Sequence, residues 1–226
     1  MKTPYKVILF DIDNTLLDFN ECAKQSILYA CDKTGLKYEN RFADAFFPIN
    51  DLLWRQVEDG VLTVNRLHEI RFKTIFTALD VACDCAEFER LFRENMRTAA
   101  VPVNGALDLL THLKGKYYLA VASNSALNQQ LARIKTADMQ NFFDGFFVSE
   151  KIGASKPDRA FFEGVLKELP TQNKDEILFI GDSINADMSG GVNFGIKTCW
   201  FNPDGKSADL PVDYTVNSLL QIKNIL

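Results

Sequence analysis

The chain has 226 residues and a formal net charge of -5 at pH 7, and 47% of its residues are hydrophobic. This length suits one α/β domain with a modest insertion, and the composition excludes a disordered chain. The negative charge argues against a nucleic-acid polymer as a partner. No apolar run reaches the roughly 20 residues that cross a bilayer, so we expect no membrane association.

The cysteines, the histidines and the N-terminal residues indicate the compartment and the kind of metal site. The five cysteines are odd in number and form no C-x-x-C pair, which favours a reducing environment. The N-terminal residues run directly into a strand-like segment and leave no room for a signal peptide. We therefore expect a cytoplasmic protein. With His68 and His112 as the two histidines, a histidine-based metal site is not expected.

The first predicted element is a strand. Tyr5–Phe10 is a short apolar run, rich in β-forming residues, that stops abruptly at Asp11. A continuous apolar run of this length is typical of a strand that is buried on both faces, as the strands of a parallel sheet are.

The next eighty or so residues contain helical patterns and no convincing buried strand. These patterns lie at Ala23–Ala30, Leu52–Val57, Leu67–Leu79 and Phe88–Met96. We interpret residues 19–99 as an all-helical domain inserted after the first strand, and we assign residues 1–18 and 100–226 to the α/β core. Aromatic residues at helical spacing within the insertion are better explained as its core than as a site.

Strands and helices alternate in the remainder of the chain. The expected elements are a helix at Gly105–Leu113, strands at Tyr117–Ala122 and Gly145–Val148, a helix at Asp158–Leu169, and strands at Ile177–Ile180 and Thr198–Phe201. This alternation predicts βαβ units and a parallel sheet. The predicted fold class is therefore α/β with an inserted helical domain.

Polar residues of a few kinds recur where the predicted strands end. Ligands of doubly wound sheets bind beyond the carboxyl ends of the strands, so these residues are site candidates. Asp11–Asp13 and Ser123-Asn124 are each also explained as a helix cap or a turn, and Lys156-Pro157 alone indicates little. Their recurrence at successive strands favours a common site over separate caps. The residues are Asp11, Asp13 and Thr15 after the first strand, Ser123 and Asn124 after the second, Lys156 after the third, and Asp182 and Asp187 after the fourth.

The residue types in this set suit the chemistry of phosphoryl transfer. The four aspartates would repel one another unless a cation lay between them, and Mg²⁺ prefers carboxylates, carbonyls and phosphate oxygens; Mn²⁺ is the alternative ion. Asp11 can act as a covalent nucleophile. Asp13 can protonate the leaving oxygen and then activate water. Ser123 and Lys156 would stabilise the charge on the transferring group.

The ordered segments DIDNT, SN, KP and GDSINAD resemble the motifs of the haloacid-dehalogenase-like (HAD) superfamily, and the resemblance covers essentially the whole chain. It implies a Rossmann-like core with a helical cap inserted between the first two motifs. It also implies that Asp11 is nucleophile and metal ligand. Asp13 would be general acid and base, and would bind the metal through its carbonyl.

The same resemblance implies roles for the other candidates. Asp182 would bind the metal, and Asp187 would be a ligand or support one. Thr15 would hydrogen-bond within the first loop, and it joins the substrate-binding set with Ser123, Asn124 and Lys156. The dehalogenases that name the superfamily lack the second aspartate, so Asp13 indicates phosphate chemistry. The commoner phosphatase motif has glycine where this chain has Asn14.

The insertion resembles a narrower group. Asn50–Trp54, Arg71-Phe72 and, in the core, Gly190–Gly195 resemble segments of the bacterial pyrimidine 5'-nucleotidases of this superfamily. Trp54 and Phe72 are better explained by packing than by base stacking. Arg71 is either a solvated helix charge or a residue that reaches the substrate.

The leading hypothesis is a nucleoside 5'-monophosphate phosphatase that acts on a small phosphorylated metabolite, as a monomer or a homodimer. A sugar-phosphate or phosphoglycolate-type phosphatase would use the same chemistry. A phosphomutase would need the aspartyl-phosphate to outlast attack by water, and the sequence leaves this open. A regulatory binding protein on the same scaffold would not need Asp11 or Asp13, and both are present.

Overall fold

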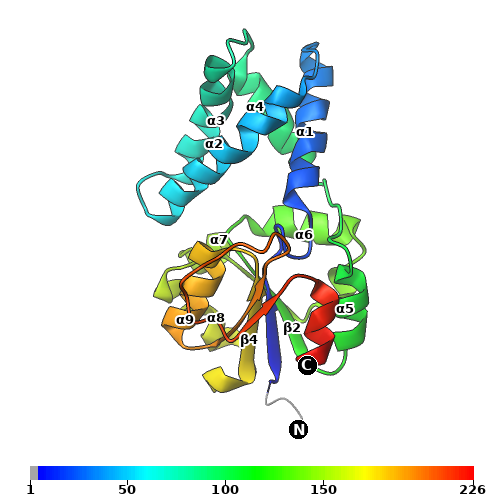
Figure 1. The fold of residues 1–226 in the computed structure, drawn as a ribbon, viewed down its shortest axis with the longest axis vertical. Helices are drawn as coiled ribbons and strands as arrows, with labels where there is room; N and C mark the ends of the chain where they lie inside the picture. Colours follow the sequence, from blue (N-terminus) through cyan, green and yellow to red (C-terminus); the bar gives the residue numbers. More distant parts are fainter. Residues whose placement is uncertain (1–4) are drawn as a thin grey trace. The chain divides into compact units, whose positions relative to one another are not determined.

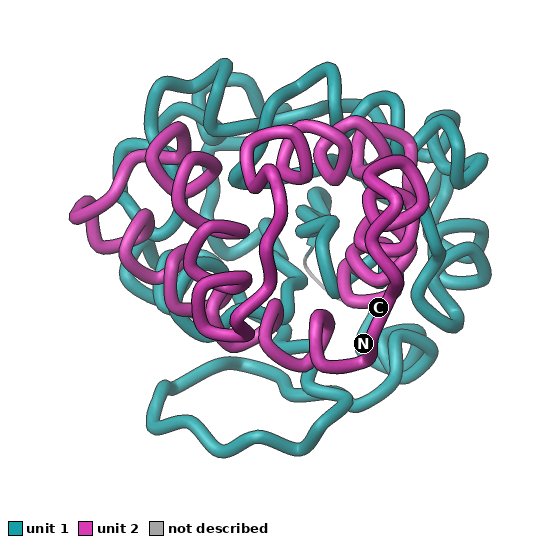
Figure 2. The backbone as a smooth tube through the Cα atoms, turned by 90° about the horizontal axis from the view of Figure 1, so that it is seen from above, with its two compact units in different colours: residues 1–18, 100–226 teal, residues 19–99 magenta. Residues whose placement is uncertain are grey.

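The computed structural model describes residues 5–226, which divide into two compact units (Figure 2). The α/β unit, in teal, runs to Asp18 and resumes at Ala100. The helical unit, in magenta, is Phe19–Ala99. Among residues 5–226, none of the helices combines the length and the hydropathy that crossing a bilayer requires.

The α/β unit is built on a six-stranded sheet in the order β3-β2-β1-β4-β5-β6, in which every pair of neighbours is parallel. The strands are β1 (Val7–Phe10), β2 (Tyr118–Ser123), β3 (Gly145–Val148), β4 (Ile177–Gly181), β5 (Lys197–Phe201) and β6 (Tyr214–Val216). The predicted α/β fold class is confirmed, and the first five strands match the predicted apolar runs. Strand β6 was not predicted, because Tyr214 and Thr215 are not fully buried and no apolar run marks it.

The two faces of the sheet belong to two separate hydrophobic clusters, because side chains alternate along each strand. Ile8 and Phe10 pack in the cluster with α5 (Ala106–Leu113) and the short helix η4 (Leu219–Asn224). Val7 and Leu9 pack with α8 (Arg159–Glu168) and with the end of α9 (Ser189–Phe194). Figure 1 shows α5 on one side of the sheet and α8 and α9 on the other. Because helices cover both faces of the sheet, side chains on both sides of each strand are buried, and the strands are continuous apolar runs in the sequence.

Several short helices complete the α/β unit. They are α6 (Leu127–Thr136), α7 (Ser149–Ile152), the 3-10 turns Gln140–Phe142 and Lys174–Glu176, and the π-helical segment η3 (Ile184–Met188). Helix α6 follows β2 directly, and η3 follows β4, so both begin beside the carboxyl ends of the central strands.

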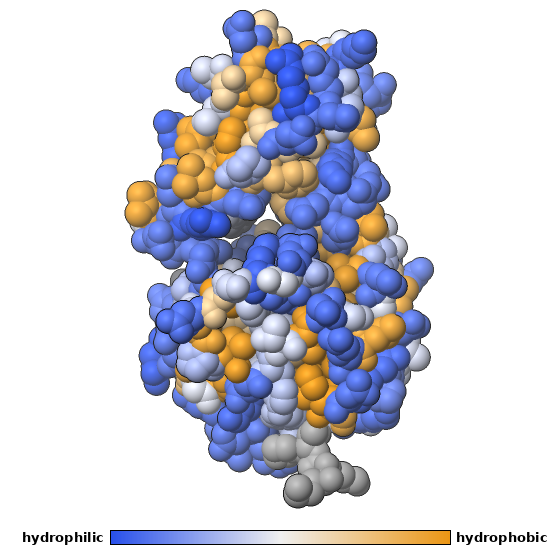
Figure 3. All heavy atoms as spheres, in the orientation of Figure 1, coloured by the Kyte–Doolittle hydropathy of each residue, from blue (hydrophilic) through white to orange (hydrophobic). Residues whose placement is uncertain are grey.

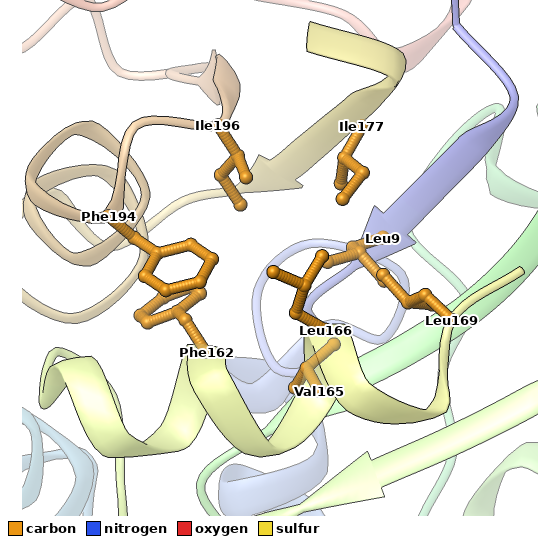
Figure 4. Close-up of a pocket in the computed structure, with 8 residues that line it drawn as sticks. All are labelled: Leu9, Phe162, Val165, Leu166, Leu169, Ile177, Phe194 and Ile196. Atoms are coloured by element: carbon orange, nitrogen blue, oxygen red, sulfur yellow. The ribbon is translucent and has the colours of Figure 1, made fainter. Parts of the chain in front are cut away.

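A small gap lies between α8 and the sheet (Figure 4). Its cavity volume is about 10 Å³, which is room for one water at most. Its lining is entirely apolar and offers nothing that could orient a ligand, so we regard it as a packing defect. The lining residues are Leu9, Phe162, Val165, Leu166, Leu169, Ile177, Phe194 and Ile196.

The helical unit consists of α1 (Phe19–Thr34), α2 (Asn40–Glu58), α3 (Val64–Ala78) and α4 (Cys85–Met96). Each overlaps one of the predicted helical patterns, and α3 ends one residue before the predicted Leu79. Helices α3 and α4 are each preceded by a residue whose side chain accepts hydrogen bonds from the first turn. Thr63 accepts from the Arg66 amide, and Asp84 accepts from the amides of Ala86 and Glu87. Such caps satisfy amides that have no partner within the helix.

A charged side chain lies inside the aromatic core of the helical unit. Arg71 is 3% exposed, and its guanidinium donates to both carboxylate oxygens of Glu89 at 2.6 and 3.1 Å and to Asn50 Oδ1 at 3.0 Å. The guanidinium also lies 4.7 Å from the centre of the Phe92 ring. Of the two interpretations of Arg71, the solvated helix charge is therefore wrong. Phe72 is buried among the same rings.

Figure 3 shows a surface on which hydrophilic residues surround scattered apolar ones. The exposed large apolar side chains among the described residues are Leu28, Leu52, Val61, Val64, Leu107, Leu131 and Leu220. They are distributed over both units, as single exposed apolar residues usually are on folded proteins.

Candidate functional site

The candidate site lies where β1, β2 and β4 end. Strand β1 is paired with β2 on one side and with β4 on the other, and Phe10 is in register with both Val121 and Ile180. From β1 the chain continues to β2 on one side, and it later places β4 on the other side of β1. The carboxyl ends of these three strands therefore form the topological switch point of the sheet. The loops that begin at Asp11, Ser123 and Asp182 consequently start side by side.

The loop after β1 is a compact turn. The amides of Thr15, Leu16 and Leu17 all donate to the carbonyl of Ile12. Asn14 has a φ of 56°, a left-handed conformation that glycine and asparagine adopt more readily than other residues. This conformation is the physical reason why asparagine can stand where the commoner motif has glycine.

Lys156 joins two of the predicted site carboxylates. Its ammonium lies 2.6 Å from Asp11 Oδ1 and 2.7 Å from Asp187 Oδ1, and it donates to the carbonyl of Ala122 at 2.8 Å. Lys156 is 2% exposed, and Asp11 and Asp187 are also buried. Burial alone would lower the pKa of the Lys156 ammonium, but the charges of Asp11 and Asp187 outweigh burial and raise that pKa.

The side chain of Asn124 holds the main chain of Lys156. Its Nδ2 donates to the Lys156 carbonyl at 2.8 Å, and its Oδ1 accepts from the Lys156 amide at 2.7 Å. Asn124 was predicted to bind substrate. In the structure its side-chain amide is committed to fixing the backbone from which the Lys156 ammonium extends.

The loop after β4 places Asp182 and Asp187. Asp187 Oδ2 accepts from the Ser183 amide at 3.1 Å. Gly181 is needed here because a Cβ at this position would collide with the Asp187 carboxylate. Thr15 Oγ1 donates to Asp182 Oδ1 at 3.3 Å, so the predicted Thr15 side chain connects the loops after β1 and β4.

Trp200 on β5 is a site neighbour that the sequence did not indicate. Its indole Nε1 donates to the carbonyl of Asp182 at 2.9 Å, and the residue is in register with Gly181 at the end of β4. The loop that carries Asp182 is therefore tied to the adjacent strand.

Three of the four predicted metal-binding aspartates form one group. Carboxylate oxygens of Asp11, Asp182 and Asp187 lie within 4.8 Å of one another. Burial raises the pKa of the Asp11 carboxyl to about 7, with Lys156 opposing the rise and Asp187 adding to it. Burial and the charges of Asp187 and Asp11 also raise the pKa of Asp182 well above its ordinary value. Three crowded carboxylates facing one ammonium fit a hard divalent cation.

The side chain of Asp13 is not in this group. Its Oδ1 lies 2.6 Å from Arg133 Nη1, and its Oδ2 accepts from Gln130 Nε2 at 3.1 Å. Gln130 Nε2 also donates to the hydroxyl of Ser123 at 3.1 Å. Gln130 and Arg133 are fully buried residues of α6, and sequence reasoning missed both. The only available signal was their three-residue spacing on one helix, close after Ser123.

Comparison with known proteins identifies the family. The family model for haloacid dehalogenase-like hydrolases matches residues 5–195. The chain belongs to this family. The HAD resemblance that the four motifs gave is thereby confirmed.

Several relatives are similar over most of the chain. The Bacillus subtilis protein YfnB, named as a HAD-hydrolase, is 30% identical over 98% of this chain and 95% of its own length. The pyrimidine 5'-nucleotidase PynA of Streptococcus pneumoniae is 30% identical over 88% of this chain and 84% of its own length. The pyrimidine 5'-nucleotidase YjjG of Escherichia coli is 26% identical, over 97% and 96% respectively.

A solved structure shares both units. The crystal structure of YfnB bound to magnesium aligns with a TM-score of 0.93 at 29% identity, and the alignment covers 98% of each chain. That structure is described as revealing interdomain movement. The HAD fold inferred from the motifs therefore agrees with a solved structure along the whole chain.

Proposed function

We propose that this chain is a Mg²⁺-dependent phosphatase that hydrolyses a nucleoside 5'-monophosphate through an aspartyl-phosphate on Asp11. The observation that carries the proposal is the imbalance of buried charge after β1, where Asp11, Asp182 and Asp187 meet Lys156 as the neighbouring cation. Such a group needs additional positive charge, and with that charge it can receive an anionic phosphate.

Asp11, Asp182 and Asp187, with the main-chain carbonyl of Asp13, would hold Mg²⁺, and Mn²⁺ is the alternative ion. The bound ion would neutralise negative charge on the carboxylates and on the phosphate. Asp187 already accepts from Lys156 and from the Ser183 amide, so it would be a ligand or would orient one.

In the first step, a carboxylate oxygen of Asp11 attacks phosphorus. The bond between phosphorus and the ester oxygen breaks, and Asp13 donates its proton to the departing oxygen. The products are a free alcohol and an aspartyl-phosphate on Asp11. Lys156 and Ser123 would stabilise the charge on the phosphoryl group during the transfer.

In the second step, Asp13 is a carboxylate and removes a proton from water. The water oxygen attacks phosphorus, and the bond between phosphorus and Asp11 breaks. Inorganic phosphate leaves, Asp11 is again a free carboxylate, and Asp13 again carries the proton. Over the cycle, one water and one phosphate ester become one alcohol and one phosphate.

The substrate class is supported by the relatives. PynA and YjjG are both named pyrimidine 5'-nucleotidases, and both align with this chain over most of its length. We propose that the helical unit, residues 19–99, is the cap domain of the enzyme. The interdomain movement described for YfnB supports a mobile cap, which is how many enzymes exclude water from a bound substrate.

A phosphate-release screen tests this proposal. The panel contains pyrimidine and purine nucleoside 5'-monophosphates, glyceraldehyde 3-phosphate, phosphoglycolate and hexose phosphates, each with and without Mg²⁺. We expect the highest kcat/KM with pyrimidine nucleotides and none without the ion. A preference for the sugar phosphates or phosphoglycolate would replace the substrate class but keep the chemistry. Conversion of a hexose phosphate to its isomer would indicate a phosphomutase, and no turnover of any member would indicate a binding protein.

A further inference from the structure

The Asp13 carboxylate is held at both oxygens by one helix. Arg133 Nη1 lies 2.6 Å from Oδ1, and Gln130 Nε2 lies 3.1 Å from Oδ2. The two donors stand three residues apart on α6, so they project from the same face of that helix. A carboxylate contacted on both oxygens from one rigid element has little freedom to rotate.

Gln130 connects this carboxylate to a second loop of the site. Its Nε2 donates to Asp13 and, at 3.1 Å, to the hydroxyl of Ser123, while its Oε1 accepts from Arg133 Nη1 at 3.1 Å. The side-chain amide thus uses its oxygen and its nitrogen at once, which fixes its orientation. One buried residue thereby connects the loop after β1 to the end of β2.

The burial of Arg133 needs an explanation beyond stability. Its side chain has 0% of its surface exposed, whereas that of Asp13 is 34% exposed. Burying a guanidinium is costly, and apolar residues of similar volume often replace buried ion pairs without loss of stability. A buried arginine whose partner still reaches solvent at the site is better explained by what it does to that partner.

We propose that Gln130 and Arg133 are positioning residues that orient the Asp13 carboxyl for proton transfer. The inference rests on the proposed function, in which Asp13 serves the leaving oxygen and then water. Without the two donors, the carboxyl would rotate about its side-chain bonds, and a small displacement of a catalytic group costs about 10²-fold in rate. A change at Arg133 should affect substrate binding little, because its guanidinium donates to Asp13 and Gln130. Gln130 also holds the hydroxyl of Ser123, so a change at Gln130 can raise KM as well.

The test measures kcat and KM for Arg133→Met, Arg133→Lys and Gln130→Leu, using the best nucleotide from the screen and p-nitrophenyl phosphate. We expect Arg133→Met to lower kcat on the nucleotide by about 10- to 100-fold, with KM changed by less than about threefold. Arg133→Lys should retain part of the rate. The loss should be smaller on p-nitrophenyl phosphate, whose leaving group needs no proton. Lys135→Met removes an exposed cation from the same helix and should leave the rate unchanged.

The same changes in an Asp13→Asn background decide between positioning and general damage. If Arg133 acts through Asp13, Arg133→Met should cost less than about threefold once Asp13 is replaced. Equal losses in both backgrounds would overturn the inference while leaving the proposed function in place. An Asp13→Asn protein with normal turnover would overturn both, because the acid–base assignment itself would fail. Should Arg133→Met not fold, Arg133→Lys carries the same comparison and the same two outcomes, because it leaves the bond from Gln130 to Ser123 in place.

Discussion

Both units of this protein bury cations, and the surroundings of Lys156 and Arg71 differ. Lys156 in the α/β unit contacts the carboxylates of Asp11 and Asp187, and Asp182 lies in the same acidic group. Arg71 in the helical unit faces one carboxylate, Glu89, together with the neutral amide of Asn50. The first cluster has more negative than positive charge, whereas the second is balanced.

The contrast shows which property of a buried charge points to a site. Burial alone does not, because Arg71 and Glu89 are buried as well as Lys156. Burial raises the pKa of Glu89, but the charge of the paired Arg71 opposes that rise. Arg71 also donates a hydrogen bond to each carboxylate oxygen of Glu89. In the α/β unit the carboxylates outnumber the cation, an arrangement that fits a further positive ion. An uncompensated buried charge is therefore the better indicator of function.

The comparison is tested most strongly by Asp11→Asn. We expect turnover to fall by about 10⁴-fold or more, because the nucleophile is removed. The melting temperature should stay level or rise, because the change removes one of three mutually repelling carboxylates. Steady-state kinetics and a thermal melt on the same preparation measure both. Near-normal turnover would contradict the mechanism, and a large fall in melting temperature would contradict the idea of an excess of charge.

Metal removal should abolish activity without a mutation. EDTA is expected to stop phosphate release, and Mg²⁺ to restore it; Ca²⁺ should restore little, because its looser coordination misplaces the nucleophile. Mg²⁺ should also raise the melting temperature of the metal-free protein, since a ligand that binds the folded state stabilises it. The rise should shrink in Asp182→Asn. Full activity in chelator, or an equal rise in both proteins, would argue against this cation site.

The balanced cluster should respond in the opposite way. Arg71→Met leaves Glu89 buried without its partner, and we expect a loss of about 3–5 kcal/mol in the free energy of unfolding. Turnover per folded molecule should be unchanged. Urea denaturation followed by circular dichroism measures the loss, and the double variant Arg71→Met/Glu89→Leu should recover most of it. Reduced turnover in a stable Arg71→Met protein would mean that Arg71 does reach the substrate.

The smallest expected effect concerns His68 in the helical unit. Burial, with help from the charges of Arg93 and Arg71, lowers the pKa of His68 from 6.5 to about 3. Between these values the unfolded chain binds a proton that the folded chain does not, so His68 makes stability fall as the pH drops. His68→Gln should therefore lose less stability than the parent between pH 7.5 and pH 5. Identical urea midpoint shifts in the two proteins would show that His68 titrates normally.

The sequence was sufficient for the parts of the site that follow strands. Asp11, Ser123 and Asp182 each stand where an apolar run stops, and parallel strands bring such positions to one edge of the sheet. The helical patterns of the insertion were also recognisable, because their apolar spacing persists over several turns. These features depend on local periodicity, which a single sequence displays.

Residues that act through tertiary contacts could not be predicted in this way. Gln130 and Arg133 are polar residues on a short helix, a pattern that normally indicates a solvent-exposed face. Their burial arises only because α6 packs against the loops that carry Asp13 and Ser123. The role of Arg71 stayed open for the same reason, since its partner Glu89 lies on another helix. Neither pairing leaves a periodic trace in the sequence.

The hydrogen bond from Trp200 to the Asp182 carbonyl gives the protein a built-in optical probe. Indole emission is sensitive to what the ring N–H touches, and here it touches the loop that supplies one of the three clustered carboxylates. The chain has two tryptophans, and the other, Trp54, belongs to the helical unit. In a Trp54→Phe protein, Trp200 is the remaining tryptophan, so its fluorescence reports on the Asp182 loop. Binding of a cation to the acidic cluster can then be followed by tryptophan fluorescence before any substrate is known.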